Sequence, residues 1–149
     1  MSRVLIVDDH AFIRRGVQAI LHSHPEWEFS GEASNGPEAI RLVGELKPQI
    51  IIMDVSMPGM NGIEATRLIR KSHPRVKVIL LTLHNSPELI RSALAAGASG
   101  YLLKTDAERE LLRALNVVVA EGTYVSPGID ADVITKIVSD QSAGIRQLH

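Results

Sequence analysis

Short apolar runs rich in β-branched residues alternate along the chain with longer segments of helical periodicity, and this alternation limits the possible folds strongly. It is the pattern of βα units built around a parallel sheet that is buried on both faces. The expected strands cover residues 3–7, 28–33, 49–53, 76–81 and 100–103. Because a helical segment follows each strand, the sequence predicts a doubly wound α/β fold with five parallel strands.

The helical segments carry apolar faces and recognisable start signals. Two of these faces consist of Phe12, Ile13, Val17, Ile20 and Leu21 and of Ala39, Ile40, Val43 and Leu46. Ser86 followed by Pro87 predicts the start of another helix, which ends at Gly97. Thr105 and Glu108 have the spacing of a capping box and predict the start of the fifth helix.

Composition excludes several classes of protein. With 149 residues, of which 45% are hydrophobic, the chain can bury one core of ordinary size. Its net charge of -1 and its lack of a Lys/Arg run argue against nucleic-acid binding by this chain alone. The absence of cysteine excludes disulfides and thiolate metal sites and fits a reducing compartment. Since no signal peptide and no apolar stretch of about 20 residues is found, we expect a soluble, cytoplasmic protein without membrane contact.

Polar residues that could react or bind a ligand stand where the expected strands end. Asp8 and Asp9 follow the first strand, Asp54 the third, Thr82 the fourth and Lys104 the fifth. In an open parallel sheet these positions share the carboxyl edge, where ligands bind. Three carboxylates gathered there would repel one another unless a hard divalent cation joins them, and Mg²⁺ is the expected ion. An aspartate such as Asp54 can also attack phosphorus as a nucleophile.

Each of these residues also has a structural explanation. Asp54 could form a turn, the Asp8–Asp9 pair could cap a helix, Thr82 could be a sheet residue, and Lys104 could be a solvated amine. The histidines support no metal or relay site: His22 and His24 do not share a helix face, whereas His10 and His84 are expected to line the rim of the site. The joint pattern at the strand ends therefore carries the functional interpretation.

Four stretches, "VLIVDDH", "IIIMDVSMPGMNGIEATRLIR", "VILLTLH" and "GASGYLLKT", resemble the receiver domain of bacterial two-component response regulators. The resemblance implies a flavodoxin-like sheet of order 2-1-3-4-5 and phosphorylation of Asp54 by a sensor histidine kinase. It further implies Mg²⁺ held by Asp9, Asp54 and the backbone carbonyl of Ser56, with Asp8 acting largely through water. Such a domain is not an enzyme beyond its own self-catalysed phosphorylation and dephosphorylation.

The same resemblance assigns Thr82 and Tyr101 to a conformational switch and Lys104 to the phosphoryl group. One departure from many receivers is Leu83, which is bulky and would slow reaction with small phosphodonors by narrowing access to Asp54.

The stretches "DDH", "LTLH", "GYLLKT" and "EGTYVSP" are similar to the NarL/FixJ (LuxR-type) subfamily, whose members usually carry a helix-turn-helix DNA-binding domain after a linker. We therefore expect a receiver domain over residues 1–122 and a linker over residues 123–149, with an amphipathic helix at about 129–139. The DNA-binding domain would lie outside this chain. The alternative is a stand-alone single-domain regulator that acts by protein–protein contact, and a homodimer is compatible with either.

Two other functions remain as alternatives. A phosphatase or phosphotransferase of haloacid-dehalogenase type also uses a strand-end aspartate, but it needs a second acid where Ser56 stands. A phosphate-independent interaction module becomes attractive if neither Mg²⁺ nor phosphate binds. A nucleotide-binding fold is disfavoured because no G-x-G-x-x-G follows the first strand.

Overall fold

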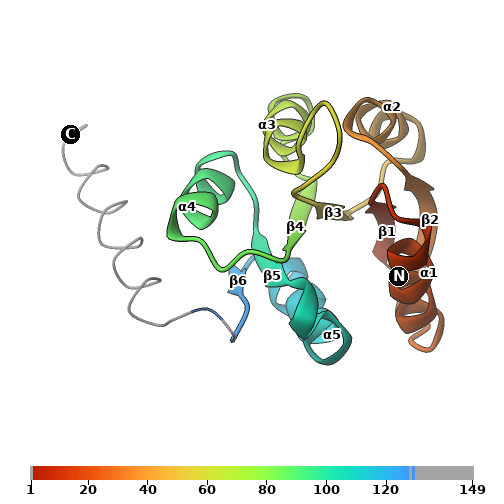
Figure 1. Ribbon diagram of the computed structural model, residues 1–149. Helices are drawn as coiled ribbons and strands as arrows, with labels where there is room; N and C mark the ends of the chain where they lie inside the picture. Colours follow the sequence, from red (N-terminus) through yellow and green to blue (C-terminus); the bar gives the residue numbers. More distant parts are fainter. Residues whose placement is uncertain (1, 128, 130–149) are drawn as a thin grey trace.

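The apolar runs form one parallel sheet in a computed structural model, which describes residues 2–127 and 129 of the chain. The order of its six strands is β2-β1-β3-β4-β5-β6 (Figure 1). The strands are β1 (Ser2–Val7), β2 (Trp27–Ala33), β3 (Ile50–Asp54), β4 (Lys77–Thr82), β5 (Gly100–Leu103) and β6 (Tyr124–Val125). The predicted order of the first five strands is confirmed, and their predicted bounds are correct to one residue at each end.

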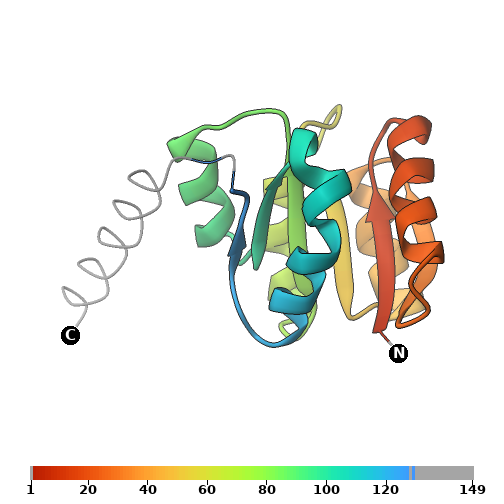
Figure 2. The ribbon, with the colours of Figure 1, turned by 90° about the horizontal axis from the view of Figure 1, so that it is seen from below.

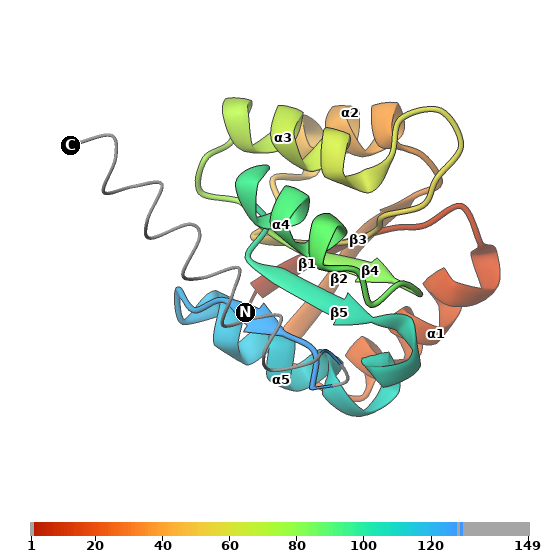
Figure 3. The same ribbon diagram turned by 60° about the vertical axis from the view of Figure 1, so that its left-hand side comes forward.

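Helices cover both faces of the sheet. The helices are α1 (Ala11–His22), α2 (Gly36–Leu46), α3 (Gly62–Ser72), α4 (Pro87–Ala95) and α5 (Ala107–Val119), with a short 3-10 helix, η1 (Lys104–Asp106). Helices α2, α3 and α4 lie on one face, and α1 and α5 lie on the other (Figure 3). The predicted doubly wound α/β fold is therefore confirmed.

Alternate residues of the central strand supply the two halves of the core. Ile51 and Met53 of β3 pack with the α2–α4 layer, whereas Ile50 and Ile52 pack with the α1–α5 layer. All four side chains are fully buried. This is why the strand is a continuous apolar run and why its end, at Asp54, is brought to the edge of a buried sheet.

Two local expectations are wrong. Phe12 does not cover the sheet: it is 83% exposed, because the first turn of α1 extends past the end of β1 (Figure 2). The capping box of Thr105 and Glu108 does not form, because residues 104–106 make the 3-10 helix and α5 begins only at Ala107. Asp106 occupies the N-cap position without a capping hydrogen bond, and its carboxylate instead accepts hydrogen bonds from Arg109 and Ser126.

The short strand β6 was not expected from the sequence. It runs parallel to β5, with Gly100 opposite Tyr124 and Tyr101 opposite Val125 (Figure 2). The Tyr124 hydroxyl donates to Glu110 of α5 over 2.6 Å. The sheet thus continues beyond the expected domain boundary at residue 122. The amphipathic helix expected at 129–139 lies outside the described residues except for Ile129, which is buried in the α2–α4 half of the core.

Candidate functional site

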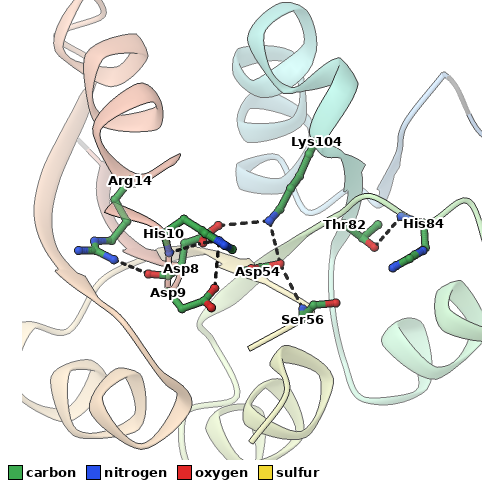
Figure 4. A network of polar contacts seen from close by, with 9 residues as sticks. All are labelled: Asp8, Asp9, His10, Arg14, Asp54, Ser56, Thr82, His84 and Lys104. Atoms are coloured by element: carbon green, nitrogen blue, oxygen red, sulfur yellow. Dashed lines mark hydrogen bonds and ion pairs between the residues drawn. The ribbon is translucent and has the colours of Figure 1, made fainter. Parts of the chain in front are cut away.

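The strand-end residues meet at the carboxyl edge of the sheet, as Figure 4 shows. Asp8 and Asp9 follow β1, Asp54 ends β3, and Lys104 follows β5. Since β3 lies between β1 and β4, Asp54 is placed at the centre of this edge.

Asp54 is a buried carboxylate with two defined contacts. Its side chain is 2% exposed, and Oδ1 lies 3.1 Å from Lys104 Nζ. The backbone N–H of Ser56 donates to the same oxygen over 3.1 Å. The other oxygen, Oδ2, is buried and has no hydrogen-bond partner among the described residues. One oxygen is therefore oriented by donors while the second remains available for a ligand or a reaction partner.

The surroundings of Asp54 raise its pKa above the usual value for an aspartate. Burial is the largest cause and the negative charge of Asp8 is the next. The hydrogen bond and the positive charge of Lys104 act in the opposite direction, as does the N–H of Ser56. A cation placed next to the carboxylates would lower this pKa and favour the ionised, nucleophilic form.

Asp8 and Asp9 complete an acidic cluster with Asp54. Asp8 is almost fully buried, and its Oδ2 lies 3.5 Å from Lys104 Nζ, whereas the side chain of Asp9 is 26% exposed. One potential ligand atom from each of Asp8, Asp9, His10 and Asp54 lies within 4.8 Å of the others. Asp8 and Asp54 share one ammonium group, that of Lys104, and buried oxygens of all three acids lack hydrogen-bond partners among the described residues. This donor set fits a hard divalent cation such as Mg²⁺.

His10 was expected only to line the rim of the site, but it also contacts the acid pair. Its ring Nδ1 lies 3.0 Å from Asp8 Oδ1 and 3.2 Å from Asp9 Oδ1, so it contacts both acids (Figure 4). Nearby, the Arg14 guanidinium donates to the backbone carbonyl of Asp8. Sequence patterns gave no sign of the His10 contacts, because they depend on the turn between β1 and α1.

Comparison with known proteins identifies the family of this chain. Residues 4–116 match the family model of the response regulator receiver domain. The chain belongs to the response regulator receiver family. The chain is therefore a receiver domain of two-component signalling, and the predicted resemblance is confirmed.

Individual relatives of this receiver are described as transcriptional regulatory proteins or response regulators. The transcriptional regulatory protein DegU of Brevibacillus brevis is 39% identical over 132 residues, which are 89% of this chain and 56% of that protein. A LuxR-family two-component response regulator from Aurantimonas has a similar structure, with a TM-score of 0.84, 33% identity and coverage of 95% of this chain and 99% of that one. A structure described as two RcsB dimers bound to two parallel DNAs gives a TM-score of 0.77 at 27% identity, covering 83% of this chain and 63% of that one. This chain spans a little over half the length of DegU.

Thr82 and Tyr101 of the receiver are linked through the β4–α4 loop. Thr82 Oγ1 accepts a hydrogen bond from the His84 N–H over 3.0 Å, and the Tyr101 hydroxyl donates to the His84 carbonyl over the same distance. Tyr101 is fully buried, and burial raises the pKa of its hydroxyl, which therefore stays protonated and able to donate. The two residues predicted to form the switch thus hold the same loop residue.

Gly62, the first residue of α3, is a site residue that sequence reasoning missed. A Cβ atom at this position would lie 2.2 Å from the Asp54 carbonyl oxygen and 3.0 Å from Val55 Cα. The Gly62 N–H donates to the Val55 carbonyl over 2.8 Å. Only glycine allows α3 to begin this close to the strand end that carries Asp54.

Among the residues described, no helix is long and apolar enough to cross a membrane.

Proposed function

We propose that Asp54 accepts a phosphoryl group from a sensor histidine kinase in a Mg²⁺-dependent reaction, and that the resulting conformational switch controls transcription through a DNA-binding domain outside this chain. The observation that carries this proposal is the buried Asp54 carboxylate. One of its oxygens is held by Lys104 and Ser56, and the other has no hydrogen-bond partner among the described residues. Membership in the receiver family supports it.

The chemistry divides among residues of the site. An Asp54 oxygen forms a bond to phosphorus while the bond from phosphorus to the kinase histidine breaks, and the electron pair stays on the imidazole nitrogen. Lys104, 3.1 Å from Asp54, is placed to neutralise charge on the transferred oxygens. Asp9, Asp54 and the Ser56 carbonyl would hold Mg²⁺, with Asp8 acting through water. When bound, Mg²⁺ would neutralise charge on the carboxylates and the phosphoryl oxygens.

The switch proposed for Thr82 and Tyr101 uses the loop that both residues contact. If Thr82 Oγ1 turns toward a phosphoryl group on Asp54, it gives up the hydrogen bond from His84, and the loop carrying the Tyr101 contact is released. Phosphorylation would then change the balance between two arrangements of the β4–α4 loop. Leu83, which is 68% exposed in this loop, is proposed to hinder small phosphodonors.

The wider setting is proposed from the relatives. Because DegU is a transcriptional regulatory protein and the RcsB structure shows dimers on DNA, we propose DNA control through a second domain and assembly as a homodimer. A cytoplasmic location and the absence of any enzymatic activity beyond self-catalysed phosphorylation and dephosphorylation belong to the same proposal.

The test is the mass of the intact protein after incubation with a histidine kinase, or with acetyl phosphate, in the presence of Mg²⁺. Wild-type protein should gain one phosphoryl group, and Asp54→Asn should gain none. Glu64→Gln, the same chemical change on an exposed position of α3, should behave like wild type. A normal gain in folded Asp54→Asn would disprove the assignment.

A further inference from the structure

His10 is held on the acid pair by both its backbone and its side chain. Its N–H donates to Asp8 Oδ1 over 2.9 Å, and its ring Nδ1 lies 3.0 Å from that oxygen. The same Nδ1 lies 3.2 Å from Asp9 Oδ1. Since the residue occupies the N-cap position of α1, with extended backbone, its ring is directed back over the strand end.

These separations are those of neighbouring ligands around a metal ion. An octahedral ion with bonds of about 2.1 Å places adjacent donor atoms about 3.0 Å apart. The two distances from His10 Nδ1 to the carboxylate oxygens are 3.0 and 3.2 Å. A fourth donor atom, from Asp54, lies within 4.8 Å of the other three. A small inward movement would therefore bring the His10 nitrogen and one oxygen each of Asp9 and Asp54 around a single ion, with Asp8 acting through water.

Independent evidence for a missing cation comes from the buried oxygens. Oδ2 of Asp54 and Oδ2 of Asp8 belong to side chains that are at most 2% exposed, and neither accepts a hydrogen bond from the described residues. Buried carboxylate oxygens without such partners are costly unless a cation approaches them. Lys104 is a single positive charge and lies 3.5 Å from Asp8 Oδ2.

We propose that His10 is a nitrogen ligand of this site and strengthens its binding of first-row transition-metal ions but not of Mg²⁺. Magnesium takes oxygen ligands almost exclusively, whereas imidazole nitrogen suits Zn²⁺, Fe²⁺, Ni²⁺ and Cu²⁺. Mn²⁺ favours carboxylate oxygen as Mg²⁺ does, but its unpaired electrons report a coordinated nitrogen directly, so it serves as the probe ion. A site with three carboxylates alone has no such nitrogen to offer. The inference rests on the metal site of the proposed function and adds a nitrogen ligand that the acids cannot supply.

The alternative role for His10 is to orient the acids by hydrogen bonding, as an outer partner of the metal ligands. His10→Gln separates the two roles, because glutamine keeps an N–H donor but has no imidazole nitrogen. His22→Gln is the matched control, since His22 is an exposed residue in the last turn of α1.

The experiment titrates the full chain with Mn²⁺ and, separately, with Mg²⁺ by calorimetry, and records pulsed electron paramagnetic resonance of the Mn²⁺-bound protein. Wild type and His22→Gln should show ¹⁴N coupling to the bound Mn²⁺. In His10→Gln the ¹⁴N coupling should vanish and Mn²⁺ affinity should fall about tenfold, while Mg²⁺ affinity changes less than about twofold.

Bound Mn²⁺ without ¹⁴N coupling in wild type would overturn the proposal, and so would equal losses for both ions in His10→Gln, which indicate an orienting role only. The metal titrations and the ¹⁴N coupling are measured without phosphorylating Asp54. If Asp54 gains no phosphoryl group but the nitrogen coupling is present, the proposed function fails and this inference stands. If Asp54 is phosphorylated normally and the coupling is absent, the proposed function stands and this inference fails.

Discussion

At the scale of single residues, Asp54 is in a setting that favours function over stability. Its pKa is raised in the folded protein, chiefly by burial and then by the charge of Asp8. The folded state therefore binds the Asp54 proton more tightly than the unfolded state does. This contribution to stability is present below the pKa of the unfolded chain, about 4, and is lost as the pH rises through the folded-state pKa.

Asp54→Asn should consequently increase the free energy of unfolding at neutral pH, because asparagine has no charge to bury. The gain over wild type should be small near pH 4 and grow as the pH rises to 7, when divalent cations are removed with a chelator. Urea denaturation across this pH range measures it, with Glu64→Gln as the exposed control. A variant that is no more stable than wild type at pH 7 would contradict the account of Asp54.

The residues of the site differ in how far the sequence could predict them. Asp54 and Lys104 were predicted because each stands at the end of an apolar run, and parallel strands bring such ends together. The contacts of His10 and the close packing of Gly62 could not be predicted, because both depend on distances across loops. A histidine after two aspartates, or a glycine at a helix start, has many ordinary explanations.

At the scale of elements, the start of α3 determines where the reactive strand end lies. The contact between Gly62 and the backbone of Asp54 leaves no space for a methyl group. Gly62→Ala must therefore move the helix start or the strand end, at a cost of about 1–3 kcal/mol in the free energy of unfolding.

Gly44→Ala is the matched control for this prediction. Gly44 lies in α2, with nothing within 4 Å of an added Cβ, so alanine should stabilise the protein by about 0.5–1 kcal/mol. Urea denaturation gives both values, and Gly62→Ala should also take up the phosphoryl group more slowly. Equal stability of the two variants would show that the close approach at Gly62 is unimportant.

Elements were predicted well where the apolar pattern was long. Strands β1, β3 and β4 contain runs of four or more apolar or β-branched residues, VLIV, IIIM and VILLT. Strand β2 (WEFSGEA) contains no such run and was the least certain prediction. Strand β6 has only two residues, which is too short to show a period. The capping box predicted at Thr105 does not form, because the neighbouring Asp106 makes hydrogen bonds with Ser126 and Arg109 that the local sequence signal does not reveal.

At the scale of the whole molecule, the segment after α5 joins the receiver to whatever follows it. The Ser126 N–H donates to the Tyr101 carbonyl over 3.0 Å, so the departing chain is bonded to the backbone of the proposed switch residue. Ser126 also donates to Asp106 through its hydroxyl, and Ile129 lies in the same half of the core as Tyr101. From the sequence this segment was predicted to be a linker, because Ser126 contacts residues that are 20 or more positions away along the chain.

Strand β6 also covers the edge of β5, which could otherwise pair with strands of other molecules. The four residues of the neighbouring strand β5 carry no charge. The N–H groups of Tyr124 and Ser126 donate hydrogen bonds to the backbone carbonyls of Ser99 and Tyr101. A chain cut after Gly122 would expose this edge as a template for strands of other molecules, a common route to aggregation. The shortened chain should therefore form large, β-rich particles that scatter light increasingly with concentration, whereas a chain that ends after residue 129 should not. If both remain monodisperse, the two residues of β6 have no such shielding role.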